Sequence, residues 1–381
     1  MFDNTIKFIK SLFPERDFIP LHAPVFAGNE KLYLEECIDT SFVSSVGKFV
    51  DEFELSVAEY TGAKYSVAIV NGTAALQVAL QIAGVMKDDL VITQPLSFIA
   101  TCNAISHLQA SPLFIDVDIS TMGLSHEKLE EFLEKETFIA ENGHCYHTVS
   151  RKKIAACVPM HTFGHCCKID KISEICIKYN IELVEDAAEA IGSYYQGKHS
   201  GTIGKIGVFS FNGNKTITCG GGGSLVTNDQ LIAMRAKHIT TQAKVPHPWN
   251  FVHDELGYNF RMPNINAAVA CAQMEQLSGF VENKRQLAKE YQNFFEHEKI
   301  NFVNEPTGAL SNYWLNALLL KDRSERDAFL NETNAKGVMT RPVWELMHRL
   351  QMFNNCLKGN LDNAEYLADR LVNIPSSVRG D

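Results

Sequence analysis

The chain contains 381 residues, of which 45% are hydrophobic and 21% are charged, as in ordinary soluble globular proteins. Its length exceeds the roughly 250 to 300 residues at which a single hydrophobic core stops growing, so we expect two domains. The formal charge of −10 argues against nucleic acid or an anionic membrane as the principal partner.

No apolar run approaches the roughly 20 residues that a membrane span requires. The cysteines form no C-x-x-C pair, which suits reduced thiols, so we expect a cytoplasmic protein. Histidines and cysteines gather in residues 144–147 and 161–167, but without the spacing of a zinc module, so we predict no metal site. Residues 1–18 place apolar side chains at near-helical spacing and lack a signal-peptide cleavage site, which predicts a docked helix.

Between residues 65 and 228, short apolar runs alternate with segments of helical length. The runs are SVAIV, LVITQ, LFIDVD, IAACVPM, IELVEDA, IGVFSF and GSLVTN. This alternation is typical of a mainly parallel sheet covered by helices on both faces. The last two runs are joined by a glycine-rich stretch too short for a crossover helix, so we predict a hairpin there.

The first run leads through a glycine into a helix predicted over residues 73–83, with Thr73 as its capping residue. Free N–H groups and the positive end of a helix dipole can bind phosphate at such a turn, and Gly72, Thr73 and Ala74 are the predicted donors. A purely structural turn also explains this segment when it is considered alone. Phe98, which follows the second run, could stack on a flat ring or belong to the core.

The run IELVEDA ends in an acid and two small alanines. Asp186 could form a charge-assisted hydrogen bond with a pyridinium nitrogen, or it could simply cap a helix. The adjacent Glu185 should point to the other face of the strand. In the predicted hairpin loop, Lys215 precedes four glycines, which suits a lysine that forms a Schiff base and must then swing aside. A solvated loop lysine is the alternative, and the nearby Ser210 could bind phosphate.

Two other phosphate motifs are not supported. The loop around Lys215 lacks the first glycine of a Walker A sequence, because Val208 stands at that position, and no G-x-G-x-x-G follows a strand. After about residue 245 a long helical stretch begins near Ile265. We therefore predict an N-terminal segment and large domain over residues 1–245, and a smaller C-terminal domain over residues 246–381.

The segments NGTAALQVAL, PLSFIATCNAI, FIDVD, HTFGH, EDAAEAIGS, FSFNGNKTITCGGGG and GYNFRMPNINAAVA resemble, in this order, the landmarks of the DegT/DnrJ nucleotide-sugar aminotransferases. The resemblance implies a fold-type I α/β enzyme with a seven-stranded, mostly parallel sheet, a smaller C-terminal α/β domain and pyridoxal 5'-phosphate (PLP) as cofactor. Lys215 would then bind the cofactor as a Schiff base.

The resemblance also assigns the other cofactor contacts. Asp186 would bind the pyridine nitrogen, and Phe98 would cover the ring. The phosphate would be bound by Ser210, Thr73 and Ala74. Asn259 matches an asparagine that reaches the phosphate from the neighbouring subunit, which implies a homodimer with shared active sites. Glu189 would lie beside the phenolic oxygen, where many relatives carry Gln or His, and a carboxylate there needs a shared proton or a cationic neighbour.

Residues 18–26, 44–53 and 340–348 resemble the branch that serves legionaminic acid and bacillosamine synthesis. This branch transfers an amino group from L-glutamate to C4 of a nucleotide-diphosphate-linked 4-keto-6-deoxy-N-acetylhexosamine. The residue types that suit the diphosphate, base or sugar are His161, Arg341, Trp344 and His348, although domain-interface packing also explains each of them. Amination at C3 and PLP binding without turnover are the alternative functions.

Overall fold

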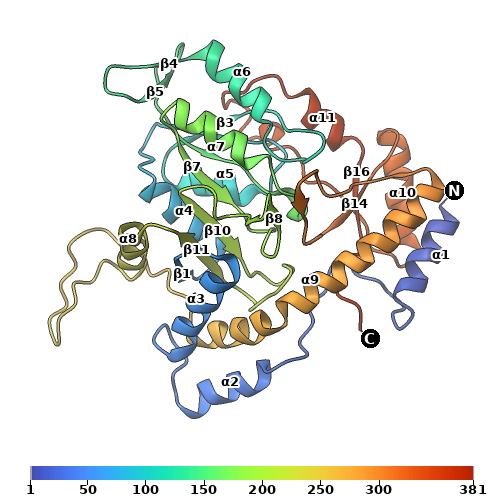
Figure 1. The fold of residues 1–381 in the computed structure, drawn as a ribbon, viewed down its shortest axis with the longest axis horizontal. Coiled ribbons are helices and arrows are strands. Elements are labelled where there is room, and N and C mark those ends of the chain that lie inside the picture. Colours follow the sequence, from blue (N-terminus) through green and yellow to red (C-terminus); the bar gives the residue numbers. More distant parts are fainter. Residues whose placement is uncertain (1, 381) are drawn as a thin grey trace.

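The computed structural model describes residues 2–380 and contains the predicted central sheet (Figure 1). Its strands are β1 (Tyr65–Ile69), β2 (Leu90–Thr93), β3 (Ser111–Phe114), β6 (Ile154–Val158), β7 (Glu182–Asp186), β10 (Ile206–Ser210) and β11 (Gly223–Thr227). They follow the order β1-β11-β10-β7-β6-β2-β3. Only β11 runs antiparallel to its neighbours in this sheet, since the remaining pairs are parallel. The predicted strands, the hairpin and the fold class are confirmed.

Helices cover both faces of this sheet. One face carries α4 (Gly72–Ile82), α5 (Ile99–His107) and α8 (Gln230–Thr240). The other carries α3 (Lys48–Thr61), α6 (His126–Glu136), α7 (Ile169–Lys178) and the first part of α9 (Asn264–Glu298), against which α2 (Glu30–Asp39) packs. Burial on both faces explains why the sequences of these strands are continuous apolar runs.

A second, smaller sheet in the order β12-β14-β16-β15 forms the C-terminal part. Its strands are β12 (Asn301–Phe302), β14 (Asn316–Leu319), β15 (Arg341–Pro342) and β16 (Leu371–Ile374), accompanied by α10 (Arg323–Ala335) and α11 (Asp362–Ala368). Short strands elsewhere are β4 (Thr137–Ile139), β5 (Cys145–His147), β8 (Tyr194–Tyr195), β9 (Lys198–His199) and β13 (Ala309–Leu310), and short 3-10 turns span Thr162–Gly164 and Met347–Arg349.

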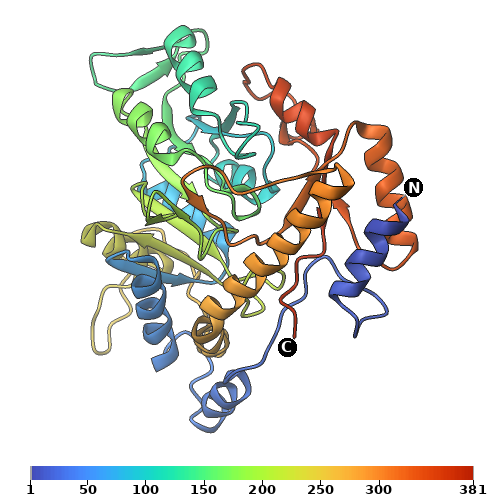
Figure 2. The ribbon, with the colours of Figure 1, turned by 45° about the vertical axis from the view of Figure 1, so that its right-hand side comes forward.

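The structure differs from the predicted division into residues 1–245 and 246–381. Helix α1 (Asp3–Leu12) forms as expected, but it lies beside α10 and buries Ile6 and Ile9 in the core of the C-terminal part (Figures 1 and 2). Helix α9 belongs to both parts, since it packs on α3 near its beginning and contributes Tyr291 and Phe295 to the C-terminal core. Apolar periodicity predicted both helices but carried no information on which sheet each would cover.

The parallel strands β2, β6, β7 and β10 all end at the edge of the sheet that faces the C-terminal part. Ligands of open α/β sheets bind at this edge. Within residues 2–380, every helix is too short or too polar to span a lipid bilayer.

Candidate functional site

A cavity of about 380 Å³ lies at the ends of these strands and brings together residues from distant parts of the chain. The predicted site residues that line it are Gly72, Thr73, Phe98, Asp186, Glu189, Ser210, Lys215 and Trp344. Residues that the sequence did not single out also line it, namely Asn71, Leu76, Ala100, Met160, Ala188, Asn212, Asn214 and Trp314. Its volume suits a cofactor-sized ligand.

One wall of the cavity is the first turn of α4. Asn71 caps the helix, because its side-chain oxygen accepts the N–H of Ala74 at 2.8 Å. Asn71, and not the predicted Thr73, is therefore the capping residue, and the N–H of Ala74, a predicted phosphate donor, is bonded to Asn71 in this structure. The Gly72 and Thr73 positions do line the cavity beside Ser210. A Cβ atom on Gly72 would lie 2.9 Å from Cβ of Ser210, so only glycine lets the helix end approach this serine so closely.

Asp186, the last residue of β7, is buried at the floor of the cavity. Its carboxylate accepts the Thr101 hydroxyl at 2.6 Å and the Ala188 N–H at 3.2 Å. Burial raises the pKa of Asp186, while the hydrogen bonds from Thr101 and Ala188 oppose that rise. This carboxylate would be stabilised by a cationic group of a ligand placed against it.

Lys215 lies in the loop between β10 and β11 and points to a second carboxylate. Its Nζ is 3.2 Å from Oε1 of Glu189, and Oε2 of Glu189 accepts the Phe163 N–H at 2.9 Å. Burial raises the pKa of Glu189 to about 7, against the opposing effects of Lys215 and the Phe163 amide. Lys215 thus supplies the cationic neighbour that a carboxylate at position 189 was expected to need.

The aromatic residues at the mouth of the cavity come from both parts of the chain. Phe98 precedes α5 and is half exposed, and its ring centroid is 6.1 Å from that of Trp344. Trp344 also contacts Phe163, at 5.2 Å between ring centroids. The two rings form an apolar surface beside the polar floor of Asp186 and Lys215.

Three of the four predicted substrate residues lie outside the cavity. His161 is fully buried, with Nε2 at 2.9 Å from Glu185 and Nδ1 accepting the Cys167 N–H at 3.1 Å. His348 is bonded to Glu365 at 2.9 Å. Arg341 is exposed on β15 and donates to Asn334 and to the Thr340 carbonyl. The expected substrate contact of His161 is wrong for this structure, because both ring nitrogens are engaged in the interior.

Two further sequence expectations concern residues outside this cavity. Glu185 points away from it, as predicted from the alternation of side chains along β7, and it is fully buried. Asn259 is exposed in the segment between α8 and α9, where it pairs with Thr241, and it does not line the cavity of its own chain.

Comparison with known proteins agrees with this geometry. Residues 25–379 match the DegT/DnrJ/EryC1/StrS aminotransferase family. The chain is 36% identical over 359 residues to GDP-perosamine synthase from Escherichia coli O157:H7, covering 94% of this chain and 93% of that one. It is 33% identical over 363 residues to GDP-perosamine synthase from Caulobacter vibrioides, with the same coverage of 94% and 93%.

The structure of the aminotransferase TlmJ from Streptoalloteichus hindustanus superposes with a TM-score of 0.85 at 26% identity, covering 94% of this chain and 93% of that one. The chain belongs to the DegT/DnrJ/EryC1/StrS aminotransferase family. It is therefore a PLP-dependent sugar aminotransferase that acts on nucleotide sugars.

The cavity residues fit PLP. The cofactor supplies an electron-withdrawing ring that stabilises negative charge at the carbon bonded to the amino nitrogen. Lys215 would hold it covalently, and Asp186 would hold its ring nitrogen in the protonated state. The Gly72 and Thr73 amides with the Ser210 hydroxyl would bind its phosphate.

Three side chains that line the cavity or bond to one of its residues carried weak signals in the sequence. Asn71 could have been found as a capping residue directly before the Gly72 turn. Thr101 lies in a helical segment, and no local pattern shows that its hydroxyl meets Asp186. Trp314 is about a hundred residues from Lys215 in the chain, so that only the fold brings the two together.

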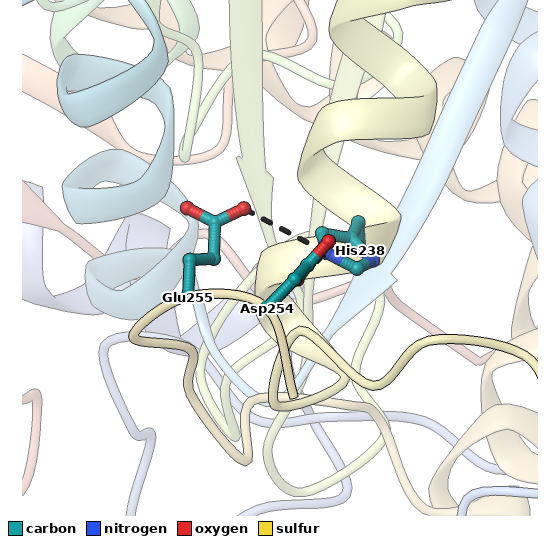
Figure 3. A group of neighbouring side chains, drawn as sticks. All are labelled: His238, Asp254 and Glu255. Atoms are coloured by element: carbon teal, nitrogen blue, oxygen red, sulfur yellow. Dashed lines mark hydrogen bonds and ion pairs between the residues drawn. The ribbon is translucent and has the colours of Figure 1, made fainter. Parts of the chain in front are cut away.

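A separate group of possible metal ligands lies on the surface, where His238, Asp254 and Glu255 converge (Figure 3). Nε2 of His238 is 2.7 Å from Asp254 and 3.6 Å from Glu255. Arg235 also forms a two-bond ion pair with Glu255, so a positive charge already occupies this cluster. We interpret these contacts as ion pairs that hold the segment before α9 against α8.

Proposed function

We propose that the protein transfers the amino group of L-glutamate to C4 of a nucleotide-linked 4-keto-6-deoxy-N-acetylhexosamine, in the synthesis of a bacterial surface sugar of the legionaminic acid or bacillosamine type. The observation that carries the proposal is the meeting of Lys215, Asp186 and Glu189 in one cavity of a sugar aminotransferase. The 4-amino sugar in the name of the GDP-perosamine synthases supports amination at C4.

The chain's own residues would divide the work. Asp186 would keep the ring nitrogen of the cofactor protonated, and the α4 turn would bind its phosphate group, which would orient the cofactor toward Lys215. The free amine of Lys215 can move a proton between substrate and cofactor carbons. Phe98 and Trp344 supply an apolar surface on one side of the cavity, against which a flat ring could stack.

The test offers the purified protein L-glutamate and a UDP-linked 4-keto-6-deoxy-N-acetylhexosamine. We expect 2-oxoglutarate and a 4-amino sugar in equal amounts, with the position of the amine read by NMR. Lys215→Ala should form no product and no borohydride-stable bond to the cofactor. Product aminated at C3, or full turnover by Lys215→Ala, would refute the proposal. A cofactor that binds but is not converted by glutamate would favour binding without turnover.

A second candidate substrate is a GDP-linked 4-keto-6-deoxyhexose without the acetamido group. It is favoured by the GDP-perosamine synthases among the relatives, at 31% to 36% identity. Competition between equal concentrations of the two nucleotide sugars would decide between them. The proposal predicts that the ratio of kcat/KM favours the N-acetylated substrate by at least tenfold, and the opposite ratio would select the second candidate.

We further propose that the active form is a homodimer in which Asn259 reaches the phosphate of the partner subunit. Figure 1 shows the segment between α8 and α9 extending away from the body of the subunit. Its apolar side chains are strongly exposed, with Phe251 at 80% and Leu256 at 92%. Exposed apolar residues also gather near the start of α3, where Phe42 and Val46 lie. Such a surface indicates a protein partner.

Mixing two impaired variants tests this arrangement. Lys215→Ala subunits should form no product alone, and Asn259→Ala subunits should be weakly active alone. In a mixed dimer, one site would combine an intact Lys215 with an intact Asn259 from the other chain. Activity should then rise after subunit exchange, and its absence in confirmed mixed dimers would place both residues in the same subunit's site or exclude Asn259 from it.

A further inference from the structure

Trp314 contacts the loop of Lys215 at two points. Its indole is almost fully buried and lines the cavity. Nε1–H donates to the Asn214 carbonyl at 2.6 Å, and Nζ of Lys215 lies 4.1 Å from the centroid of the ring. One side chain from the C-terminal part thus holds the backbone beside Lys215 and also faces its terminal amine.

Glu189 contacts the same amine through Oε1, at 3.2 Å. A carboxylate and the face of an indole both attract the ammonium group of a lysine. The other titratable groups that act electrostatically on this region are Asp186, at the cavity floor, and His22, from the N-terminal segment. Lys215 therefore has a defined position in which its charge is compensated.

Asn312 fixes Glu189 and Trp314 relative to each other. Its Nδ2 donates to the Glu189 carbonyl at 2.9 Å and to the Ile191 carbonyl at 2.8 Å. Its Oδ1 accepts the N–H of Trp314 at 2.8 Å. The fit is tight, since a Cβ on Gly164 would lie only 1.9 Å from this oxygen. The two groups that face the lysine are thus part of one buried, hydrogen-bonded unit.

We propose that Trp314 and Glu189 form a resting site for the amine of Lys215, occupied in the pyridoxamine form of the enzyme, between one half-reaction and the next. This inference rests on the proposed function, in which the amine must leave the cofactor and return in every cycle. The resting site makes no covalent bond. It would bind the ammonium group by charge and by the π face of the indole, and it would keep the amine near the cofactor site until the next substrate binds. Trp314 is therefore a positioning residue.

The test measures the reactivity of Lys215 in holoenzyme that glutamate has converted to the pyridoxamine form. An acylating reagent must displace the amine from its contacts before it can react, so the resting site should protect Lys215. Removing the carboxylate in Glu189→Gln, which changes little in size, should raise the rate of labelling about tenfold, measured by mass spectrometry. Trp314→Leu should raise it by a similar factor, while Trp314→Phe, which keeps a ring face, should stay within about threefold of the wild type.

Trp344→Leu is the matched control, because Trp344 lines the same cavity without facing Lys215. It also removes an indole from the wall of the cavity, and labelling should stay within about twofold of the wild type. The Trp314→Leu variant should also slow the first half-reaction about tenfold, with the KM for glutamate little changed. Equal labelling of the wild type, Glu189→Gln and Trp314→Leu would overturn the resting site. Failure of glutamate to convert the wild-type cofactor would instead refute the proposed function.

Discussion

Glu185 and Asp186 are adjacent buried carboxylates of β7 with opposite surroundings. Glu185 accepts three backbone N–H groups, from Gly201, Ile203 and Gly204, at 2.8, 2.7 and 2.5 Å, and it also pairs with His161. Burial would raise the pKa of Glu185, but these bonds outweigh it and hold the pKa below its usual range. Asp186 accepts only two bonds, and burial raises its pKa.

The comparison separates a structural carboxylate from a functional one. A buried carboxylate whose acceptor sites are all hydrogen-bonded cannot bind a ligand. A carboxylate at a cavity wall that still has a free acceptor site can bind one. Glu189 belongs to the second kind, since its pKa rises to about 7 at the same wall. Both kinds come from one short segment, and the alternation of side chains along β7 sends them to different environments.

The largest effect should follow from Asp186→Asn. The amide keeps the size of the side chain but cannot stabilise a protonated ring nitrogen, so kcat/KM should fall on the order of 10³-fold. The free energy of unfolding should change by less than about 1 kcal/mol, because no satisfied buried charge is lost. Steady-state kinetics at saturating PLP and urea unfolding measure the two quantities. Activity of Asp186→Asn within tenfold of the wild type would show that the Asp186 carboxylate is not needed to bind the cofactor.

Glu185→Gln should instead lower the stability of the protein. An amide cannot replace an anion that accepts four hydrogen bonds, so the variant should lose about 3 kcal/mol of unfolding free energy. Glu182→Gln is the matched control on the same strand, because Glu182 is partly exposed and pairs only with Lys205, and it should cost less than about 0.5 kcal/mol. Equal losses in the two variants would show that the buried network around Glu185 carries no stability.

The sequence predicted one half of this comparison better than the other. Asp186 and Lys215 could be found because each ends or follows a predicted strand, and strand ends meet at one edge of a parallel sheet. His161 could not be assigned correctly, because its engagement with Glu185 and Cys167 depends on contacts that the residues around it do not encode. The N–H of Ala74 is a different case, because it is bonded to the side chain of Asn71, a local capping contact that the sequence offered.

Long-range packing limited the prediction of the fold in a similar way. The sequence predicted all seven strands and the helices α4 and α9, and most predicted ends lie within one or two residues of the observed ones. The run predicted for β3 extended to residue 118, whereas the strand ends at Phe114. The sequence did not show that α1 packs on the C-terminal sheet, nor that Trp314 crosses to the Lys215 loop. Such contacts join segments far apart in the chain, and no local pattern specifies their partners.

The pH dependence of the free energy of unfolding should differ in sign between the contributions of Glu189 and Glu185. In protein freed of cofactor, the carboxyl of Glu189 has a pKa of about 7 when folded, against 4.5 for an unperturbed glutamate side chain. The folded state therefore holds a proton that the unfolded chain loses, and wild-type stability should fall relative to Glu189→Gln by about 1–3 kcal/mol between pH 4.5 and 7. For Glu185, with its lowered pKa, the contribution is lost only as the pH falls into the acid range. Urea unfolding of Glu189→Gln and Glu185→Gln across this range measures the difference, and the same sign for both would contradict the comparison.

The smallest effect should come from Thr101→Val, which removes one of the two hydrogen bonds of Asp186 while keeping the shape of the side chain. Thr101 donates to Asp186 at 2.6 Å and lies 3.1 Å from the Ser97 hydroxyl, so its loss leaves the carboxylate less fixed and less favoured as an anion. We expect kcat/KM to fall about tenfold and PLP to bind more weakly, as measured by kinetics and by fluorescence titration of the cofactor. Thr101→Ser keeps the hydroxyl and should stay within about threefold of the wild type. If serine and valine were equally slow, the threonine methyl group and not its hydroxyl would position Asp186, and the distinction between satisfied and partly satisfied carboxylates would not extend to this bond.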